Sequence, residues 1–363
     1  MVLYYFYKKM YNVINYEYRW ESMPSGKIMT ISVCMIVKNE ERVLARCLDS
    51  LSGLYDELII VDTGSTDSTK HIAEKYTDKI FEFTWVNDFS AARNFAFSKA
   101  TMEYIYSADA DEVLNEENRA RFKALKDNLI PEIEIVQMKY GNQLSNGTVY
   151  NFDEEYRPKL FKRLRSFTWI EPVHEMVRLD PVVYDSDIVI THLPENVHAK
   201  RDIGIFEGRL KKGENLSDRL WGMYARELFL AGEDEDFANA AKYFGALANS
   251  DVSEEMLQTA CLVCTHAARV SGNSDEFFKY AIKLITGEGC SEICMEMGLW
   301  YEAKEDFDEA IVWFLNACSN SQPVIKLTSG GKDPLKHLID IYEKIGDLEQ
   351  ARVCREELAK IDN

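Results

Sequence analysis

Residues 103–112 read EYIYSADADE, an apolar run followed at once by a cluster of carboxylates. The apolar part, 103–107, predicts a buried strand. Ligands of parallel sheets bind at the carboxyl ends of the strands, and Asp109 and Asp111 come directly after this one. Two carboxylates one residue apart supply the hard oxygen ligands that Mg²⁺ and Mn²⁺ prefer. The stretch therefore predicts a metal site at a strand end, with a solvated acidic turn as the alternative.

Strand and helix patterns alternate on the N-terminal side of this stretch. Strands are predicted at 31–37, 57–61 and 79–84, and helices at 40–52, 67–76 and 89–100. Strands joined by short helical crossovers are typical of a parallel sheet. From 132 to 190 the pattern stays strand-like but loses its regularity, which indicates an added antiparallel part. The predicted fold class is therefore α/β, with a Rossmann-like, mainly parallel sheet.

Length and charge indicate a second domain. The chain has 363 residues, more than a single core usually holds. Its net charge is −19, and residues 217–363 contribute −13 of it, from 14 basic and 27 acidic residues. So acidic a chain is not expected to bind nucleic acid or an anionic membrane, because both repel it.

The hydrophobic segments indicate neither export nor a membrane anchor. The apolar runs are too short to span a bilayer, and the apolar residues at 1–7 lack the other features of a secretory leader. Eight cysteines without such a leader indicate reduced thiols. We therefore expect a cytoplasmic protein with no integral membrane segment.

These patterns divide the chain into three regions. They are an aromatic N-terminal extension at 1–28, the α/β domain at 29–215 and an all-α domain at 216–363. The α domain contains degenerate repeats with tetratricopeptide-like spacing. The copies are marked by Gly298, Tyr301, Asp306, Ala310, Phe314, Ala317 and Pro323, by Tyr342, Gly346, Asp347 and Ala351, and more weakly by Asp236, Ala240, Phe244 and Leu247. Stacked repeats expose a groove that suits a peptide or a second copy of the chain.

Two further polar clusters follow strands and are expected at the same edge of the sheet. Val37, Asn39 and Glu40 follow the first strand, and Asp62 and Gly64 follow the second. An acid at the end of the second strand can accept a hydrogen bond from a ribose hydroxyl or a base N–H. Gly64 permits a tight turn and a close approach of the ligand. The chain carries neither GxGxxG nor a Walker lysine motif, so the signatures of dinucleotide-binding and P-loop proteins are missing.

Four blocks of sequence carry a family resemblance. They are ISVCMIVKNEE at 31–41, IIVDTGSTDST at 59–69, FSAARNFAF at 89–97 and SADADE at 107–112. In this order, residues 30–200 resemble a family 2 glycosyltransferase with a GT-A fold. The later Trp-x4-His-Glu and the helical repeats resemble the subgroup that glycosylates peptides or proteins, to which the bacteriocin S-glycosyltransferases belong.

The resemblance implies how a nucleotide-sugar donor binds. The uracil and ribose of a UDP-sugar would be held by Val37, Asn39, Glu40, Asp62 and Gly64. Many family members have a second Asp where this chain has Thr63, so the usual contact to the base is altered. Arg93 would lie near the diphosphate, where its permanent charge and fixed donors suit phosphate, and Asn94 beside it would support the site.

The resemblance also implies a metal site. Asp109 would face the ribose and the metal, Asp111 would be the main protein ligand of Mn²⁺ or Mg²⁺, and Ala110 lies between them in the donor site. GT-A enzymes often add a histidine from a late strand. His192 follows the strand predicted at 187–190 and fits that place, with a structural histidine as the alternative.

The residues Trp169, His174 and Glu175 form the expected acceptor-side cluster. GT-A enzymes keep their general base near this position, so Glu175 is the candidate base and His174 the alternative, and a packing role for the pair stays open. Trp169 offers a flat face for a sugar ring, or packs in the core. A basic run would lie near the diphosphate or a peptide, or would form a solvated face; it comprises Arg157, Lys159, Lys162, Arg163 and Arg165.

Together these parts imply a metal-dependent, inverting transferase. The metal and Arg93 would neutralise the charge that develops on the leaving nucleoside diphosphate, while a base-activated acceptor attacks C1 from the opposite side. The expected donor is a UDP-sugar, with glucose or N-acetylglucosamine as the sugar, and the expected acceptor is a peptide or protein side chain. The alternatives are transfer onto a surface glycan or lipid-linked sugar, and an inactive transferase-like repeat scaffold. The helical domain would recognise the acceptor or form a homodimer.

Five residues of the helical domain suggest a zinc site at first sight. They are Cys261, Cys264, His266, Cys290 and Cys294. Both groups lie within apolar helical patterns, where a buried cysteine packs as a small hydrophobic residue. We therefore expect core packing rather than metal binding.

Overall fold

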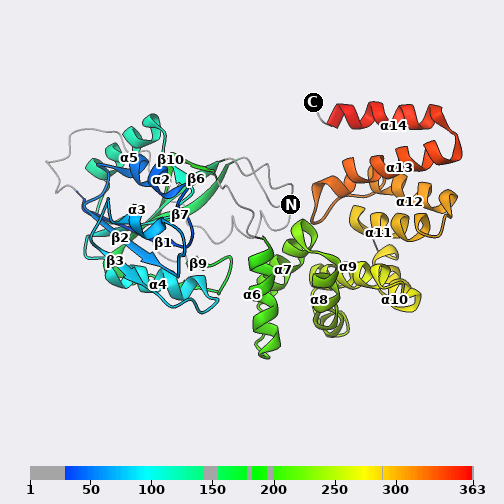
Figure 1. The fold of residues 1–363 in the computed structure, drawn as a ribbon, viewed down its shortest axis with the longest axis horizontal. Helices are drawn as coiled ribbons and strands as arrows, with labels where there is room; N and C mark the ends of the chain where they lie inside the picture. The colour runs from blue at the N-terminus through cyan, green and yellow to red at the C-terminus, as the bar shows by residue number, and fades with distance from the viewer. Residues whose placement is uncertain (1–28, 142–153, 178–181, 194–198, 288, 362–363) are drawn as a thin grey trace. The chain divides into compact units, whose positions relative to one another are not determined.

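The computed structural model describes residues 29–141, 154–177, 182–193, 199–287 and 289–361, drawn in colour in Figure 1. They form two compact units, one ending at 193 and the other beginning at 199. The second unit starts with helix α6, Ala199–Lys211, which the boundary expected at 215 assigned to the first domain. The aromatic extension at 1–28 lies outside the described residues.

The described part of the first unit contains an eight-stranded sheet and a separate two-stranded one. The strands are β1 Ile31–Val37, β2 Glu57–Asp62, β3 Ile80–Glu82, β4 Tyr104–Ala108, β5 Glu112–Val113, β6 Ile135–Gly141, β7 Glu154–Lys162, β8 Trp169–Ile170, β9 Met176–Val177 and β10 Val183–His192. The large sheet has the order β3-β2-β1-β4-β7-β6-β10-β5, and β8 pairs with β9. Strand β1 is parallel to β2 and β4, whereas β7 runs antiparallel between β4 and β6. The prediction of a mainly parallel sheet with an antiparallel part is confirmed.

Helices cover both faces of this sheet (Figure 1). One face is covered by α2 Leu44–Leu51, α3 Thr69–Ala73 and α5 Glu116–Asn128, and the other by α4 Phe89–Lys99. Successive side chains of a strand point to opposite faces, so Val33 of β1 packs in the core that contains α2, and Cys34 packs with Ala96 of α4. Because both faces are covered, the central strands are mainly apolar along their whole length, which is the pattern that the sequence shows.

The second unit is built from α-helices. They are α6, α7 Asp218–Ala231, α8 Asp234–Leu247, α9 Glu254–Val270, α10 Ser274–Ile285, α11 Ser291–Glu302, α12 Phe307–Ser319, α13 Lys332–Ile345 and α14 Leu348–Ile361. Consecutive helices pack against each other, as α9 does with α10, α11 with α12 and α13 with α14, and Figure 1 shows these pairs following one another along the unit. The predicted all-α region is confirmed.

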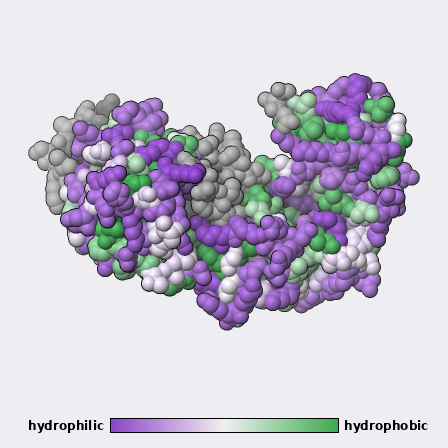
Figure 2. Space-filling model, in the orientation of Figure 1, coloured by the Kyte–Doolittle hydropathy of each residue, from purple (hydrophilic) through white to green (hydrophobic). Residues whose placement is uncertain are grey.

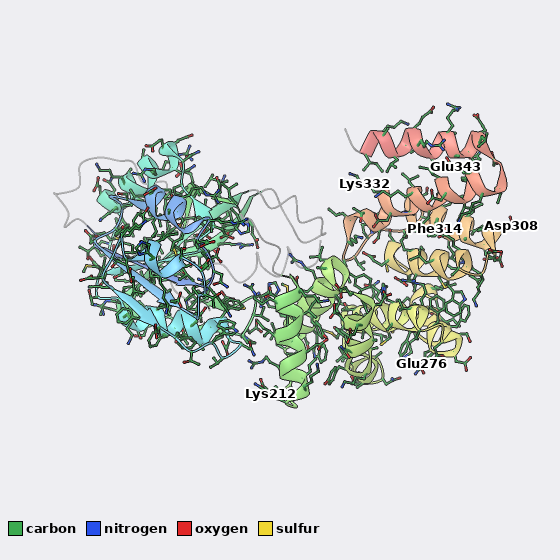
Figure 3. The ribbon with its side chains drawn as sticks, in the orientation of Figure 1. Lys212, Glu276, Asp308, Phe314, Lys332 and Glu343 are labelled. Atoms are coloured by element: carbon green, nitrogen blue, oxygen red, sulfur yellow. The ribbon has the colours of Figure 1, made fainter. Side chains whose placement is uncertain are left out.

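The repeat that contains Gly298 shows why a small residue is needed at this position. Gly298 of α11 faces Phe314 of α12, a residue labelled in Figure 3. A Cβ atom placed on Gly298 would lie 2.5 Å from the Phe314 ring. The Phe314 side chain is fully buried, so its ring cannot move aside without opening the core.

We expect Gly298→Ala to lower the stability of the helical unit by about 1 to 3 kcal/mol, the usual cost of overpacking a core. Gly222 of α7 offers a matched control, because nothing lies within 4 Å of a Cβ atom built there. Gly222→Ala should leave stability unchanged or raise it by about 0.5 to 1 kcal/mol, since alanine is the better helix former. Calorimetric melting of both variants is the measurement, and equal shifts of the two would argue against the close contact.

The surface and the helices bear on the expectation that the chain has no membrane segment. Hydrophilic residues predominate on the face of the molecule drawn in Figure 2. No helix in the described ranges is both long and apolar enough to cross a bilayer.

The residues Cys261, Cys264, Cys290 and Cys294 are buried in or beside helices, and His266 stacks on Phe237 with ring centroids 3.7 Å apart. The expected core packing of these cysteines is confirmed.

Candidate active site

Three loops follow the carboxyl ends of the neighbouring strands β1, β2 and β4. Hydrogen bonds join the first two loops: the Asn39 N–H donates to Ser65 Oγ at 3.0 Å, and Asn39 Oδ1 accepts from the Thr66 N–H at 2.7 Å. The Glu40 N–H donates to Thr69 Oγ1 at 2.7 Å. The two loops in which the resemblance places the base and the ribose therefore form one connected surface.

Asp62, at the end of β2, is almost fully buried. Its Oδ1 accepts the backbone N–H groups of Gly64 and Ser65, each at 2.9 Å, whereas its Oδ2 has no hydrogen-bond partner among the described residues. Gly64 has a φ of +107°, which glycine adopts without strain. The neighbouring Thr63 donates through both its N–H and its hydroxyl to Val37 O, at 2.9 and 3.1 Å. A buried acceptor without a partner is costly, which marks Asp62 as a ligand-binding candidate.

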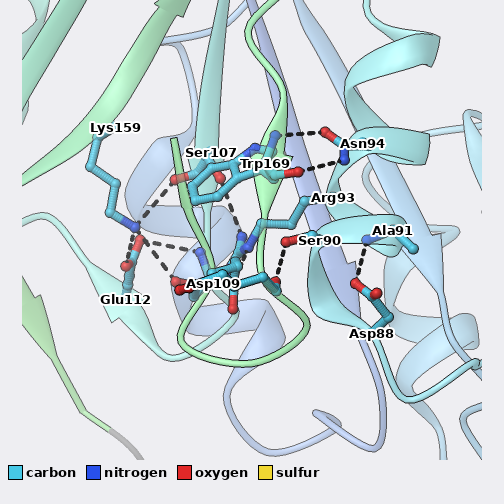
Figure 4. Close-up of polar contacts among 12 residues, drawn as sticks. Asp88, Ser90, Ala91, Arg93, Asn94, Ser107, Asp109, Glu112, Lys159 and Trp169 are labelled. Carbon is cyan, nitrogen blue, oxygen red and sulfur yellow. Dashed lines mark hydrogen bonds and ion pairs between the residues drawn. The ribbon is translucent and has the colours of Figure 1, made fainter. Parts of the chain in front are cut away.

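Arg93 of α4 lies at the centre of the site (Figure 4). Its Nε donates to Glu175 Oε1 at 2.5 Å, its Nη1 to Ser107 Oγ at 3.2 Å and its Nη2 to Asp109 Oδ1 at 2.7 Å. The guanidinium also lies over the Trp169 ring, 5.0 Å from the centroid. The side chain is only 12% exposed, so a permanent positive charge is fixed beside the end of β4.

Burial and charge have opposite effects on the pKa values of these groups. Burial alone would raise the pKa of Asp109, but Arg93 and then Lys159 lower it well below its usual range. Burial lowers the pKa of Arg93, while Asp109 and Glu175 raise it, and the net result lies above the ordinary value. Both groups are therefore charged at neutral pH.

The three expected metal ligands are divided between two places. Asp111 Oδ2 and His192 Nε2 lie 3.0 Å apart, because β5 pairs with β10 next to them. The His192 ring packs near Tyr140, with centroids 5.3 Å apart. Asp109 instead faces Arg93 and Lys159, so the expected three-residue cluster is not found. In the described ranges no group of three or more His, Cys, Asp or Glu side chains is placed to hold a metal ion as it stands.

The acceptor-side cluster lies in the hairpin of β8 and β9, which is fastened to α4. The Asn94 side chain donates to Trp169 O at 2.9 Å and accepts from the Trp169 N–H at 2.8 Å, so it holds the hairpin. At the N-terminus of α4, Ser90 Oγ donates to Glu171 O, and the Phe89 N–H donates to Pro172 O at 2.8 Å. These contacts bring the turn of the hairpin to Arg93.

Glu175 and Trp169 take different roles in this hairpin. The Glu175 side chain is 12% exposed and its carboxylate is held by Arg93, while His174 before it has a left-handed φ of +50°. Trp169 is buried and meets Phe97 and Phe161 edge-on. Trp169 is therefore a core residue, and the alternative of an open platform for a sugar ring is not supported.

The family is identified by a match that spans most of the α/β unit. Residues 32–175 match the model of Glycosyl transferase family 2. This segment is a family 2 glycosyltransferase domain. It contains the site residues described above except His192, which lies just beyond the matched range.

Curated proteins similar to this chain include three of different origin. SPbeta prophage-derived glycosyltransferase SunS of Bacillus subtilis is 33% identical over 117 residues, which cover 32% of this chain and 28% of SunS. An uncharacterized glycosyltransferase of Rickettsia typhi is 38% identical over 87 residues, 24% of this chain and 30% of that protein. A TPR repeat-containing protein of Synechococcus elongatus is 49% identical over 84 residues, 23% of this chain and 21% of that protein. The chain thus matches less than a third of the length of each relative.

Two solved structures that match this chain have lower sequence identity than these curated relatives. A glucosyl-3-phosphoglycerate synthase from Mycobacterium tuberculosis, in complex with Mn²⁺ and UDP-glucose, is 16% identical with a TM-score of 0.37; the match covers 54% of this chain and 86% of that one. TarS 1-349 of S. aureus is 15% identical with a TM-score of 0.34, over 78% of this chain and 89% of that one. Both TM-scores are below 0.5.

A buried ion pair of the glycosyltransferase domain was not expected from the sequence. Lys159, expected near a ligand or on a solvated face, is 5% exposed and pairs with Glu112 (Figure 4). Burial raises the pKa of Glu112 to about 7, although Lys159 acts to lower it. The one available signal was the position of Lys159 in a strand directly before two apolar residues, Leu160 and Phe161.

The other members of the basic run contact other groups of the same domain: two bind backbone carbonyls, one a carboxylate and one an aromatic ring. Lys162 donates to Pro131 O, Arg163 Nε donates to Met102 O at 2.5 Å, and Arg165 pairs with Glu134 at 2.6 Å. Arg157 lies over the Tyr140 ring, 4.1 Å from its centroid. Lys162 and Arg163 therefore anchor β7 and the turn after it, whereas the Arg157 and Arg165 side chains are 42% and 55% exposed, as expected of a solvated face.

Proposed function

We propose that the glycosyltransferase domain transfers a sugar from a UDP-sugar to a peptide or protein side chain, with Mn²⁺ or Mg²⁺ as cofactor. One observation carries the proposal: three different binding groups meet at the same edge of the sheet. They are the unpartnered Oδ2 of Asp62, the buried guanidinium of Arg93 and the Asp111–His192 pair. In a metal-bound nucleoside diphosphate, Asp62 suits the base or ribose and Arg93 suits the diphosphate. The Asp111–His192 pair suits the metal.

The residues present fit a divalent cation. Asp111 and His192 bring a carboxylate oxygen and an imidazole nitrogen within 3.0 Å of each other, and this mixed donor set suits Mn²⁺. These two residues would hold the ion, with water and the diphosphate completing its ligands. When bound, the cation would neutralise negative charge on the leaving diphosphate. Asp109, held between Arg93 and Lys159, would support the turn and not the metal directly.

The chain's own residues account for the remaining steps of the proposed reaction. The acceptor oxygen or sulfur forms a bond to C1 of the sugar while the bond from C1 to the diphosphate oxygen breaks, with inversion at C1. Arg93 stabilises the charge that appears on the leaving group, because its donors are already fixed. Glu175 or His174 receives the acceptor proton. Glu175 is the better candidate because the Arg93 bond holds it at the site.

The acceptor is proposed from the repeats and from the resemblance to peptide-modifying members of the family. Stacked helical repeats offer an extended surface for a peptide. The residues from 217 onward carry a net charge of −13, which favours a basic peptide. A second copy of the chain is the alternative partner of this unit.

The test is release of UDP from a panel of UDP-sugars, including UDP-glucose and UDP-N-acetylglucosamine, with and without Mn²⁺. We expect Mn²⁺-dependent release from one sugar, since slow hydrolysis of the donor does not need the acceptor. A peptide acceptor search with that sugar would follow, with a glycan and a lipid-linked sugar as comparison acceptors. Absence of release, together with absence of UDP binding in calorimetry with Mn²⁺, would refute the enzyme and favour the inactive scaffold.

A further inference from the structure

We infer that Lys159 and Glu112 are positioning residues, which hold the turn of Asp109 and Asp111 in the shape that binds the metal and the diphosphate. The inference rests on the proposed function, because it concerns the same turn. It assigns a role to the buried ion pair of Lys159 and Glu112.

Lys159 reaches the turn from β7, the strand beside β4. Its Nζ contacts Glu112 Oε1, Ser107 O at 3.2 Å and Asp109 Oδ2 at 3.5 Å (Figure 4). Ser107 lies before the turn that links β4 to β5, Asp109 lies within it, and Glu112 lies at its end. A single ammonium group therefore ties together the whole length of the turn.

Glu112 fixes the turn from the other side of the ion pair. Its Oε2 accepts the Asp109 N–H at 3.1 Å, and its own N–H donates to Asp109 O at 3.2 Å. In the pairing of β5 with β10, Glu112 lies opposite His192. The Glu112 residue thus links the backbone of Asp109 to the strand that carries His192, the partner of Asp111.

The charges explain why a lysine is needed at this place. Among the described residues, the carboxyl groups of Asp109, Glu112 and Glu175 share two cations, Arg93 and Lys159. Because Lys159 neutralises Glu112, Arg93 remains bound to Asp109 and Glu175. Without Lys159 the two carboxylates of the turn would repel each other, and the turn would lose its shape.

The test compares Lys159→Met, Glu112→Gln and the double variant in three measurements. These are the melting temperature, Mn²⁺ binding in the presence of UDP by electron paramagnetic resonance, and UDP release. Lys159→Met alone should melt earlier, because it leaves a buried carboxylate unpaired. The double variant removes both charges, so its melting temperature should return close to that of the wild type.

The decisive result is Mn²⁺ binding by the double variant. We expect its affinity to stay about 10- to 100-fold weaker than that of the wild type, the usual effect of losing a partner behind a metal ligand. The rate of UDP release by the double variant should fall together with its Mn²⁺ affinity. Lys162→Met is the matched control, because Lys162 lies on the same strand and donates to Pro131 O outside the site; it should bind Mn²⁺ normally.

Each outcome decides the inference. Wild-type Mn²⁺ affinity and UDP release in a double variant that melts normally would overturn it and leave a purely structural ion pair. If the double variant does not fold, Glu112→Gln takes its place, and normal Mn²⁺ affinity in that variant would overturn the inference equally. Failure of the proposed function looks different, because then the wild type itself would neither bind Mn²⁺ with UDP nor release UDP.

Discussion

Arg93→Met is expected to slow UDP release by about a hundred- to a thousandfold, the usual cost of removing a fixed donor from a developing negative charge. The same change leaves Asp109 and Glu175 without their shared cation. Removing one partner of a buried ion pair costs about 3 to 5 kcal/mol, so the melting temperature should also fall. In the variant the pKa of Asp109 should rise, because Arg93 is the strongest of the influences that oppose the effect of burial.

Arg93→Lys separates the catalytic effect from the structural one. It keeps the charge, but one ammonium group cannot reproduce the planar fork that bonds Glu175, Ser107 and Asp109 at once. We expect stability to recover largely while UDP release stays slow. Arg121→Met is the control, since its contacts with Glu117 and Asp187 lie at the surface, where an ion pair is worth less than about 1 kcal/mol. Wild-type UDP release in a folded Arg93→Met variant would rule out the proposed role of this guanidinium.

Asp111→Asn is expected to abolish Mn²⁺ binding in the presence of UDP and to slow UDP release by about a thousandfold. A bound metal supplies several kcal/mol of charge stabilisation, and about 1.4 kcal/mol corresponds to a factor of ten in rate. Asparagine has the same shape as aspartate and can still bond His192, which lies 3.0 Å away, so the fold should persist. Electron paramagnetic resonance of Mn²⁺ and the UDP-release assay are the measurements.

A matched exchange elsewhere in the same unit tests whether the effect is local. Asp127 lies exposed on α5, and Asp127→Asn should change neither Mn²⁺ binding nor UDP release. His192→Gln should weaken Mn²⁺ binding less than Asp111→Asn does, because Mn²⁺ prefers a carboxylate oxygen to an imidazole nitrogen. Mn²⁺ affinity that is the same in Asp111→Asn and in the wild type would disprove the proposed metal site.

Local patterns were sufficient to predict the sheet and the loops at its edge. β1, β2 and β4 are buried on both faces, so each appears in the sequence as a mainly apolar run. Asp62 and Gly64 follow such a run directly, and their geometry depends on neighbours two or three residues away. Asp111 and His192 could be paired only with the help of the family resemblance, since 81 residues separate them.

The roles of Lys159, Asn94 and Trp169 depended on contacts between distant segments. Asn94 and Trp169 are 75 residues apart, and their paired hydrogen bonds exist only because the β8–β9 hairpin packs against α4. Lys159 and Glu112 are 47 residues apart, and the lysine is buried because β7 inserts antiparallel beside β4.

The amino-acid sequence by itself therefore determined the order of strands and helices up to β4 and the positions of the polar loops. These depend on hydrophobic periodicity and on residues close together in the chain. Only the tertiary structure decided which charges are buried together, and that Asp109 faces Arg93 and Lys159 instead of joining Asp111 and His192. The physical reason is that a charged side chain on a strand can lie in water or in the core, and its distant partners determine which.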